Sequence, residues 1–462
     1  MNQTYRYFEQ FLSYCILAII LLTNQGCRQH NRQEKTEQPN VILILADDMG
    51  LGDLSYFNDG LTRTPNLDQL VEEGVWFSQA YSTAPVCAPA RAALLTGRYP
   101  HRTGCVTLGM KRFPELTKMD KDLPTMTDIF RDNGYATGLI GKWHCGEGEG
   151  YHPMGRGFQE FEGFVGYMVK SYFSYELDVQ GKLYKFEDQY LTNNLSERAI
   201  EFVRRHKDEP FFLHLAHYAP HRPIGAPKEL VDYYLGKGFN EKNATIYAMI
   251  EIMDQGIGKL MAELDNLEIR ENTLVIFSSD NGPDPIPGER FNKGLRGSKY
   301  TIYEGGIHVP FIVNWKGKLE PAQKKEVIHF TDVFPTLVYL CNLQLPASID
   351  FDGGSMAGLL MGKAENNLPE KRFWQWNRGV PLYSHNAAMR QGKWKLVRPF
   401  VTRNIPDGPS EQRSVLYNLE NDPFEEHDVS KQNQQIFENM KVMLEQWCRE
   451  MEFSRLNNNE QN

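Results

Sequence analysis

Continuous apolar runs recur along the chain and predict its main strands. The first run, NVILILA at residues 40–46, is apolar from its second position to its last. A run without polar alternation is typical of a parallel strand that is buried on both faces of its sheet. Similar runs occur at residues 136–140, 211–215, 273–277 and 309–313.

Segments with apolar positions at helical spacing lie between these runs. They are found at residues 66–73, 125–133, 194–205 and 244–267. This alternation predicts an α/β fold in which helices cover both faces of a large, mostly parallel sheet.

The pattern changes after a helix predicted at residues 331–340. A stretch containing Pro and Gly at residues 345–354 is followed by short strand-like segments and a final helical segment, at residues 371–376, 387–390, 394–398, 414–418 and 434–453. We therefore predict a large domain at residues 39–345. The smaller α+β subdomain at residues 346–462 would hold a small antiparallel sheet and a terminal helix.

The N-terminus has the pattern of a targeting segment. Residues 11–23 are apolar, which suits the core of a signal peptide but is short for a membrane span. Cys27 follows a Gly, as at a lipoprotein cleavage site, and residues 28–38 form a polar tether. We predict a signal peptide at residues 1–27 and export to the periplasm of a bacterium, or anchoring to the outer membrane through a lipid on Cys27. The alternative for the apolar segment is a short buried helix.

Charge and cysteine content narrow the classes of partner and site. The net charge is -9, from 50 Lys and Arg against 59 Asp and Glu, which argues against a nucleic-acid binder or a binder of anionic membranes. Beyond a lipid on Cys27 we expect no membrane contact. The other cysteines outside the motif described below are widely spaced, which argues against a zinc site or a dense disulfide framework and leaves room for one or two bridges: Cys105, Cys145, Cys341 and Cys448.

Polar side chains follow the predicted strands, where ligands bind in open α/β sheets. Asp47 and Asp48 end the first run, and Asp280 and Asn281 follow the run at residues 273–277. Their hard oxygen atoms suit Ca²⁺ or Mg²⁺. Taken separately, the first pair could instead cap a helix and the second could form a turn. Two other strand ends lead to Lys142, His144 and His221.

The segment CAPARAALLTG at residues 87–97 carries the strongest signal. Pro89 suits the first turn of a helix, so Cys87 would lie at the helix N-terminus, which favours an anion. Arg91 is four residues on and shares its face. The alternative is a helix with a buried free Cys87 and a surface Arg91.

This segment resembles the sulfatase signature, Cys-x-Pro-x-Arg-x-x-x-x-Thr-Gly. Other segments fall in the order of that family and extend the resemblance over roughly residues 39–430. They contain the pair Asp47 and Asp48, Lys142 and His144, His221, the pair Asp280 and Asn281, Lys299, and later Arg390, Trp394, Lys395 and Asp422. The resemblance implies an alkaline-phosphatase-like fold and a sulfuric ester hydrolase.

The resemblance also implies the cofactors. Calcium, favoured over magnesium, would be held by Asp47, Asp48, Asp280, Asn281 and the residue at position 87. A maturation enzyme would oxidise Cys87 to formylglycine before the chain folds. One hydroxyl of the hydrated aldehyde would attack sulfur, and deprotonation of the other would release sulfate.

Roles for the remaining polar residues follow from the same resemblance. Arg91 would stabilise the formylglycine diolate, and Lys142 and Lys299 would bind sulfate oxygens. His144 would be the base for elimination, and His221, with Lys299 as a second candidate, the proton donor to the leaving oxygen. Three other histidines have no role in this scheme: His214, His217 and His308. Lys293 and Arg296 are near Lys299, and we expect them to be solvated loop charges rather than substrate contacts.

The expected substrate is a sulfated carbohydrate. Aromatic and polar residues of the C-terminal subdomain could line its cleft: Trp374, Trp376, Arg378, Tyr383 and His385. One alternative is a phosphonate monoester or phosphodiester hydrolase of the same superfamily. Another is a lipoprotein that binds sulfated glycans with Cys87 unmodified and has no catalytic activity.

Overall fold

The computed structural model describes residues 38–108, 114–363, 367–377, 386–399 and 413–460. Pro39–Asn462 forms one structural unit. The predicted signal peptide and Cys27 lie outside the described residues. Within the described ranges, no helix is long and apolar enough to cross a membrane.

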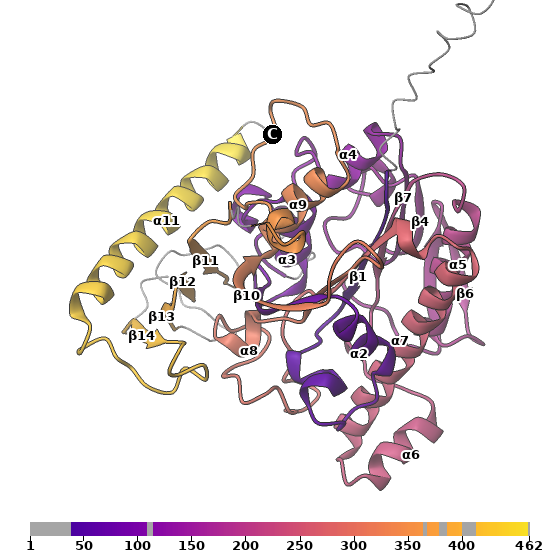
Figure 1. Cartoon of the computed structure of the whole chain (residues 1–462), viewed down its shortest axis with the longest axis horizontal. Helices are drawn as coiled ribbons and strands as arrows, with labels where there is room; N and C mark the ends of the chain where they lie inside the picture. The colour runs from indigo at the N-terminus through magenta and orange to yellow at the C-terminus, as the bar shows by residue number, and fades with distance from the viewer. Residues whose placement is uncertain (1–37, 109–113, 364–366, 378–385, 400–412, 461–462) are drawn as a thin grey trace, which may run out of the picture. The chain divides into compact units, whose positions relative to one another are not determined.

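Within the described residues the predicted mostly parallel sheet is present and has ten strands, in the order β10-β2-β9-β8-β1-β7-β3-β4-β5-β6. In Figure 1, β1 lies between the two edge strands β10 and β6. Parallel pairing joins β8, β1, β7, β3 and β4 at its centre, and β10 to β2. The strands are β1 (Asn40–Ala46), β2 (Val75–Tyr81), β3 (Ala136–Lys142), β4 (Glu160–Phe164), β5 (Tyr175–Val179), β6 (Lys182–Phe186), β7 (Phe211–Ala216), β8 (Thr273–Ser279), β9 (Phe311–Asn314) and β10 (Ala322–His329).

Strand β9 differs from its neighbours because it runs antiparallel to both β2 and β8. The apolar run at residues 309–313 predicted a strand there, but its composition could not reveal the direction. The hairpin of β5 and β6 extends the far edge, also with antiparallel pairing.

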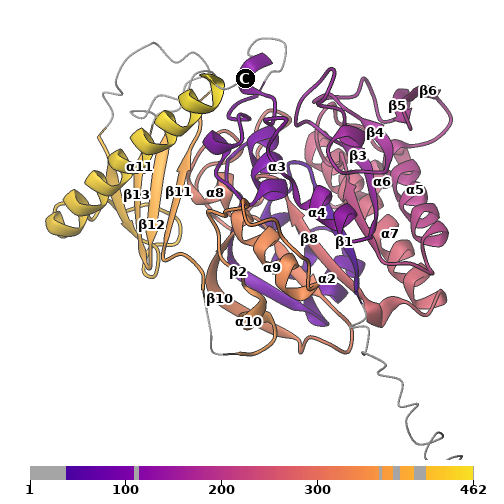
Figure 2. The same ribbon diagram turned by 90° about the horizontal axis from the view of Figure 1, so that it is seen from above.

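Helices cover both faces of the sheet, as predicted (Figure 2). Successive side chains of β1 point to opposite faces, so Val41 and Leu43 pack in one core cluster and Ile42 and Ile44 in the other. The first cluster contains side chains of α3 (Cys87–Thr96), α4 (Met126–Asp132) and α9 (Val333–Leu340). The second contains side chains of α2 (Pro65–Glu72), α5 (Leu191–Arg205), α6 (Lys228–Gly236) and α7 (Glu241–Asn266). Two short helices are α8 (Glu304–Ile307) and α10 (Ala357–Leu360).

A second sheet, antiparallel and four-stranded, lies in the C-terminal region as predicted. Its strands are β11 (Lys371–Gln375), β12 (Ala387–Gln391), β13 (Trp394–Arg398) and β14 (Val415–Asn418). Helix α11 (Gln434–Glu460) covers one face (Figure 2). The boundary near residue 345 stays a prediction.

Buried charges join the other face of this small sheet to the large one. Lys395 lies 2.7 Å from Glu304 and 2.9 Å from Glu425. Tyr81 donates a hydrogen bond of 2.7 Å to Glu304 and accepts one from Arg390. We call these five residues the charged junction.

Candidate active site

Helix α3 begins at Cys87, as the motif predicted, and Pro89 lies in its first turn. Cys87 and Arg91 are both buried, with 1% exposure each. The alternative with a surface arginine is therefore wrong. Gly97 ends the helix in the left-handed region at φ 68°, which favours glycine.

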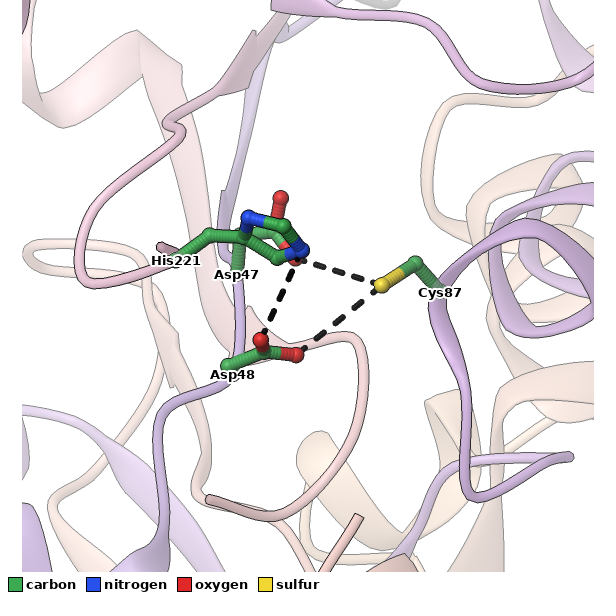
Figure 3. A group of neighbouring side chains, drawn as sticks. All are labelled: Asp47, Asp48, Cys87 and His221. Carbon is green, nitrogen blue, oxygen red and sulfur yellow. Dashed lines mark hydrogen bonds and ion pairs between the residues drawn. The ribbon is translucent and has the colours of Figure 1, made fainter. Parts of the chain in front are cut away.

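The carboxyl end of β1 brings two carboxylates to Cys87 (Figure 3). The Sγ atom of Cys87 lies 3.4 Å from Asp47 Oδ1 and 3.9 Å from Asp48 Oδ1. His221 joins them, with its Nε2 atom 3.7 Å from Asp48 Oδ2. One potential ligand atom from each of these four residues lies within 4.8 Å of the others, so the group could hold a metal ion.

The end of β8 adds Asp280 and Asn281 beside this group. Arg91 Nε donates a hydrogen bond of 2.9 Å to Asp280 Oδ2, and Arg91 Nη2 lies 2.8 Å from the same oxygen. The backbone N–H of Asp48 donates to Asp280 Oδ1 at 3.2 Å, and Asn281 Nδ2 donates to Asp48 Oδ1 at 2.7 Å. The five predicted metal ligands, with Cys87 among them, thus converge, although the tightest group of acidic, histidine and cysteine ligands contains His221 and not Asp280.

Two oxygen atoms in this cluster suit a hard cation. Asp48 Oδ2 and Asn281 Oδ1 are buried and accept no hydrogen bond from any described residue. An orphaned buried oxygen is costly, and a cation would satisfy both atoms. Burial and the neighbouring Asp47 carboxylate also raise the pKa of Asp280, which shows that negative charge is concentrated here. The donor set fits calcium.

Two buried lysines complete the centre. Lys142 Nζ lies 2.5 Å from Asp47 Oδ2, and Lys299 Nζ lies 2.5 Å from Asp48 Oδ1 and 3.2 Å from Cys87 Sγ. Burial would lower the pKa of Lys299, but the neighbouring Asp48 carboxylate raises it. The lysine therefore stays charged. Burial would raise the pKa of Asp48, but Lys299 and His221 lower it well below its usual range. Burial, followed by Asp280 and Asp47, raises the pKa of the Cys87 thiol.

Both predicted histidines are buried at the centre, and both have lowered pKa values. Burial is the main cause for each, and the positive charge of Lys142 adds to it. His144 does not continue the strand: β3 ends at Lys142, and His144 has φ 58°. The alternation of side chains along the strand therefore does not extend to His144. Neither ring nitrogen of His144 has a hydrogen-bond partner among the described residues.

The other residues considered in the sequence lie elsewhere. Arg296 donates to Tyr417 Oη and to the carbonyl of Glu425, and Lys293 lies over the ring of Phe57. His214 Nδ1 donates to the carbonyl of Leu43. Among the described residues His217 has no hydrogen-bond partner, whereas His308 Nδ1 lies 3.2 Å from Glu304 Oε2. Cys15 and Cys27 lie outside the described residues. The other four cysteines outside the motif are buried, and none of them forms a disulfide within the described part of the chain: Cys105, Cys145, Cys341 and Cys448.

The aromatic residues expected to line a sugar cleft are mostly core. Trp374 is fully buried and donates to the carbonyl of Ser82, and Trp376 is 6% exposed. The suggestion that Trp374 offers a face to sugar is therefore wrong, because both of its faces are packed. Arg378, Tyr383 and His385 lie outside the described residues.

Sequence reasoning missed three polar residues beside the centre. Arg222 Nε lies 2.8 Å from Asp284 Oδ2, and Arg222 Nη2 donates to Tyr300 Oη at 3.2 Å. Arg222 directly follows His221, Tyr300 directly follows Lys299, and Asp284 lies three positions after Asn281. This closeness to predicted site residues was the available sequence signal.

Comparison with protein families settles the relationship suggested by the motifs. The model of the sulfatase family matches residues 39–343. The chain belongs to the sulfatase family. It is a sulfuric ester hydrolase, so the predicted family, fold class and enzyme class are confirmed. A second model, described as N-sulphoglucosamine sulphohydrolase, C-terminal, matches residues 297–450 of this sulfatase.

Similar proteins share most of the length of this sulfatase. The N-acetylgalactosamine-6-O-sulfatase of Bacteroides thetaiotaomicron is 27% identical, over 93% of this chain and 96% of its own. The N-acetylgalactosamine-6-sulfatase of Homo sapiens is 29% identical, over 85% of this chain and 82% of its own. The solved structure of Ps i-CgsB in complex with k-i-k-neocarrahexaose has a TM-score of 0.79 and 31% identity, and covers 89% of this chain and 93% of its own.

Proposed function

We propose that this sulfatase hydrolyses a sulfate ester of a carbohydrate, with calcium and a formylglycine derived from Cys87. Calcium would be held by Asp47, Asp48, Asp280 and Asn281 together with residue 87. The orphaned oxygens of Asp48 and Asn281 support this ligand set. When present, calcium supplies a Lewis acid and the hydrated formylglycine supplies a hydroxyl nucleophile for sulfur.

The fixed positive charges of the centre bind and orient the sulfate group. Lys142 and Lys299 would donate hydrogen bonds to sulfate oxygens, and Arg91 would stabilise negative charge at residue 87. These side chains are already held by Asp47, Asp48 and Asp280, so little reorganisation is needed when the substrate binds.

The two histidines move protons on either side of residue 87. His221 would give a proton to the leaving sugar oxygen, and His144 would remove one from residue 87 so that sulfate can leave. Because burial and Lys142 lower the pKa of both rings, each is neutral before an anionic substrate enters. The anion would raise the pKa of a nearby imidazole and favour its protonation.

Sulfated carbohydrates are the proposed substrates because several of the similar sulfatases, including both named above, carry such a substrate in their names. Export, the signal peptide, the lipid on Cys27 and a maturation enzyme belong to the same proposal. Activity on phosphonate or phosphate esters stays an alternative, which the ratio of rates on sulfate and phosphonate esters would test. Membership of an enzyme family argues against the purely glycan-binding alternative.

The observation that carries the proposal is Cys87 at the start of α3, facing two carboxylates and Lys299. The test is the mass of the tryptic peptide at residues 64–91 from protein made together with a maturation enzyme. Conversion of the thiol to an aldehyde should lower this mass by about 18 Da, because one oxygen atom replaces a sulfur atom and two hydrogen atoms. The aldehyde is the precursor of the nucleophile. Protein made without that enzyme is the control. An unmodified peptide under both conditions would contradict the proposed mechanism.

A further inference from the structure

A polar triad lies next to the active centre and has no part in the steps described above. It consists of Arg222, Asp284 and Tyr300, joined by the ion pair and hydrogen bond given earlier. The Arg222 side chain is 38% exposed, whereas the Asp284 side chain beneath it is 3% exposed. The triad therefore presents a guanidinium to solvent and keeps its counter-ion buried.

The backbone fixes this triad to the active centre. Arg222 follows His221, and its carbonyl oxygen lies 2.6 Å from the Nδ1 atom of that histidine. Tyr300 follows Lys299, whose N–H donates to the carbonyl of Pro283, next to Asp284, at 3.0 Å. Burial alone would lower the pKa of Arg222, but Asp284, Tyr300 and Asp48 together raise it. The triad therefore lies within electrostatic reach of the Asp48 carboxylate.

The exposed part of Arg222 can only donate hydrogen bonds. Its Nε atom faces Asp284 and its Nη2 atom faces Tyr300, while Nη1 has no hydrogen-bond partner among the described residues. A guanidinium matches the geometry of carboxylate and sulfate groups, and holding it in place reduces the entropy lost on binding. Such a group favours an anion over a neutral hydroxyl.

A cavity beside Asp284 offers space for a second sugar. This cavity of about 440 Å³ is lined by Pro283, Asp284, Ser298 and neighbouring residues of the loop that leads to Lys299. Its size falls within the range of small-molecule sites, which is about 300–1,000 Å³. A glycan bound with its sulfate at residue 87 could extend past Arg222 into this cavity.

We infer that Arg222 is a specificity residue that binds a second anionic group of the glycan, beside the sulfate that is hydrolysed. This inference rests on the proposed carbohydrate sulfate activity. The second group is a carboxylate or another sulfate, because both offer oxygens in the geometry that a guanidinium prefers. Asp284 and Tyr300 are positioning residues that hold the guanidinium toward the bound glycan.

The test compares kcat/KM of Arg222→Met and wild type on four substrates. These are 4-nitrophenyl sulfate, a neutral disaccharide with one sulfate, the same sulfated sugar next to a uronic acid, and a disaccharide with two sulfates. We expect kcat/KM to fall about 10- to 100-fold on one or both dianionic disaccharides, mainly through KM, as for loss of a charge-assisted hydrogen bond. On the first two substrates it should change less than about 3-fold, and Arg222→Lys should retain part of the preference.

The matched control is Arg63→Met. Arg63 is 41% exposed and lies 2.6 Å from the buried Glu251, so it reproduces the ion pair away from the active centre. This variant should leave all four rates unchanged. Equal losses of Arg222→Met on all four substrates, or no loss on either dianionic disaccharide, would overturn the inference. A wild-type enzyme that hydrolyses 4-nitrophenyl sulfate but neither kind of disaccharide would instead contradict the proposed carbohydrate substrate.

Discussion

The active centre and the charged junction both bury carboxylates beside lysines, but their oxygen atoms differ in how they are satisfied. In the junction, both oxygens of Glu304 and Oε2 of Glu425 accept hydrogen bonds, whereas Glu425 Oε1 accepts none but lies 2.9 Å from Lys395 Nζ. In the centre, Asp48 Oδ2 and Asn281 Oδ1 have no hydrogen-bond donor among the described residues, and His221 Nε2 approaches Asp48 Oδ2 only to 3.7 Å. Buried polar groups are usually satisfied, so these two oxygens are available to a hard cation.

Buried charge serves two purposes in this protein. In the junction, the charged groups are paired with one another, and they tie the small sheet to β2 and α8. The centre keeps three positive side chains close to its carboxylates and has two buried oxygens that a cation could satisfy. Burial and ion pairing alone therefore do not identify a functional site, whereas this combination favours one.

The largest expected effect comes from removing a carboxylate from the centre. Asp280→Ala should lower kcat/KM at least about 1,000-fold, equivalent to about 4 kcal/mol of barrier, because calcium is lost and Arg91 loses its partner. Bound calcium should fall as well, measured by elemental analysis of the purified protein. Glu425→Gln is the control from the junction and should leave calcium content unchanged. A full calcium content and rate in Asp280→Ala would refute the ligand assignment.

The next effect tests whether the junction is purely structural. Lys395→Met leaves Glu304 and Glu425 buried without their cation, and should lower the free energy of unfolding by about 3–5 kcal/mol. Urea denaturation measures this loss. Lys393→Met, two residues away, removes an exposed partner 3.6 Å from Glu420 and should cost less than about 1 kcal/mol. If the two variants lost equal stability, the junction would not differ from surface charge.

The smallest effect concerns one proton in the centre. His221→Ala should slow hydrolysis of sugar sulfates about 100-fold more than that of 4-nitrophenyl sulfate, because an aryl leaving group needs no proton donor. The ratio of kcat values on the two substrates measures this difference. His217→Ala, four residues earlier and also buried, should change both rates by the same factor. A ratio that stays constant in His221→Ala would argue against a proton-donor role.

The central strands were predictable because a strand buried on both faces is apolar at nearly every position. The runs that became β1, β3, β7 and β8 contain almost no polar residue, since both faces are covered. Strand β2 contains Ser78 and Gln79, and β10 begins Ala-Gln-Lys-Lys. Strand β10 lies at the sheet edge and β2 is next to it. Their polar positions interrupt the apolar pattern, so both strands were missed.

The residues of the centre were predictable, but their geometry was not. The spacing of the motifs identified Cys87, Asp48 and His144 through resemblance to a family. The left-handed conformations of Asp48, at φ 69°, and of His144 could not be predicted from the sequence, because residues other than glycine adopt them only uncommonly. The Arg222 triad was missed because its members have no shared motif.

The wide sequence separation within the centre has a consequence for the timing of biosynthesis. Cys87 and Lys299, which are in contact, are 212 residues apart, and β1 pairs with β8 across a similar interval. At typical synthesis rates of about 5–20 residues per second, the ribosome needs roughly 10–40 s to reach Lys299 after it passes Cys87. Throughout that interval the motif lacks the strands that later bury it. The order of the strands thus gives a modifying enzyme a period of access to Cys87 that ends when the central sheet closes.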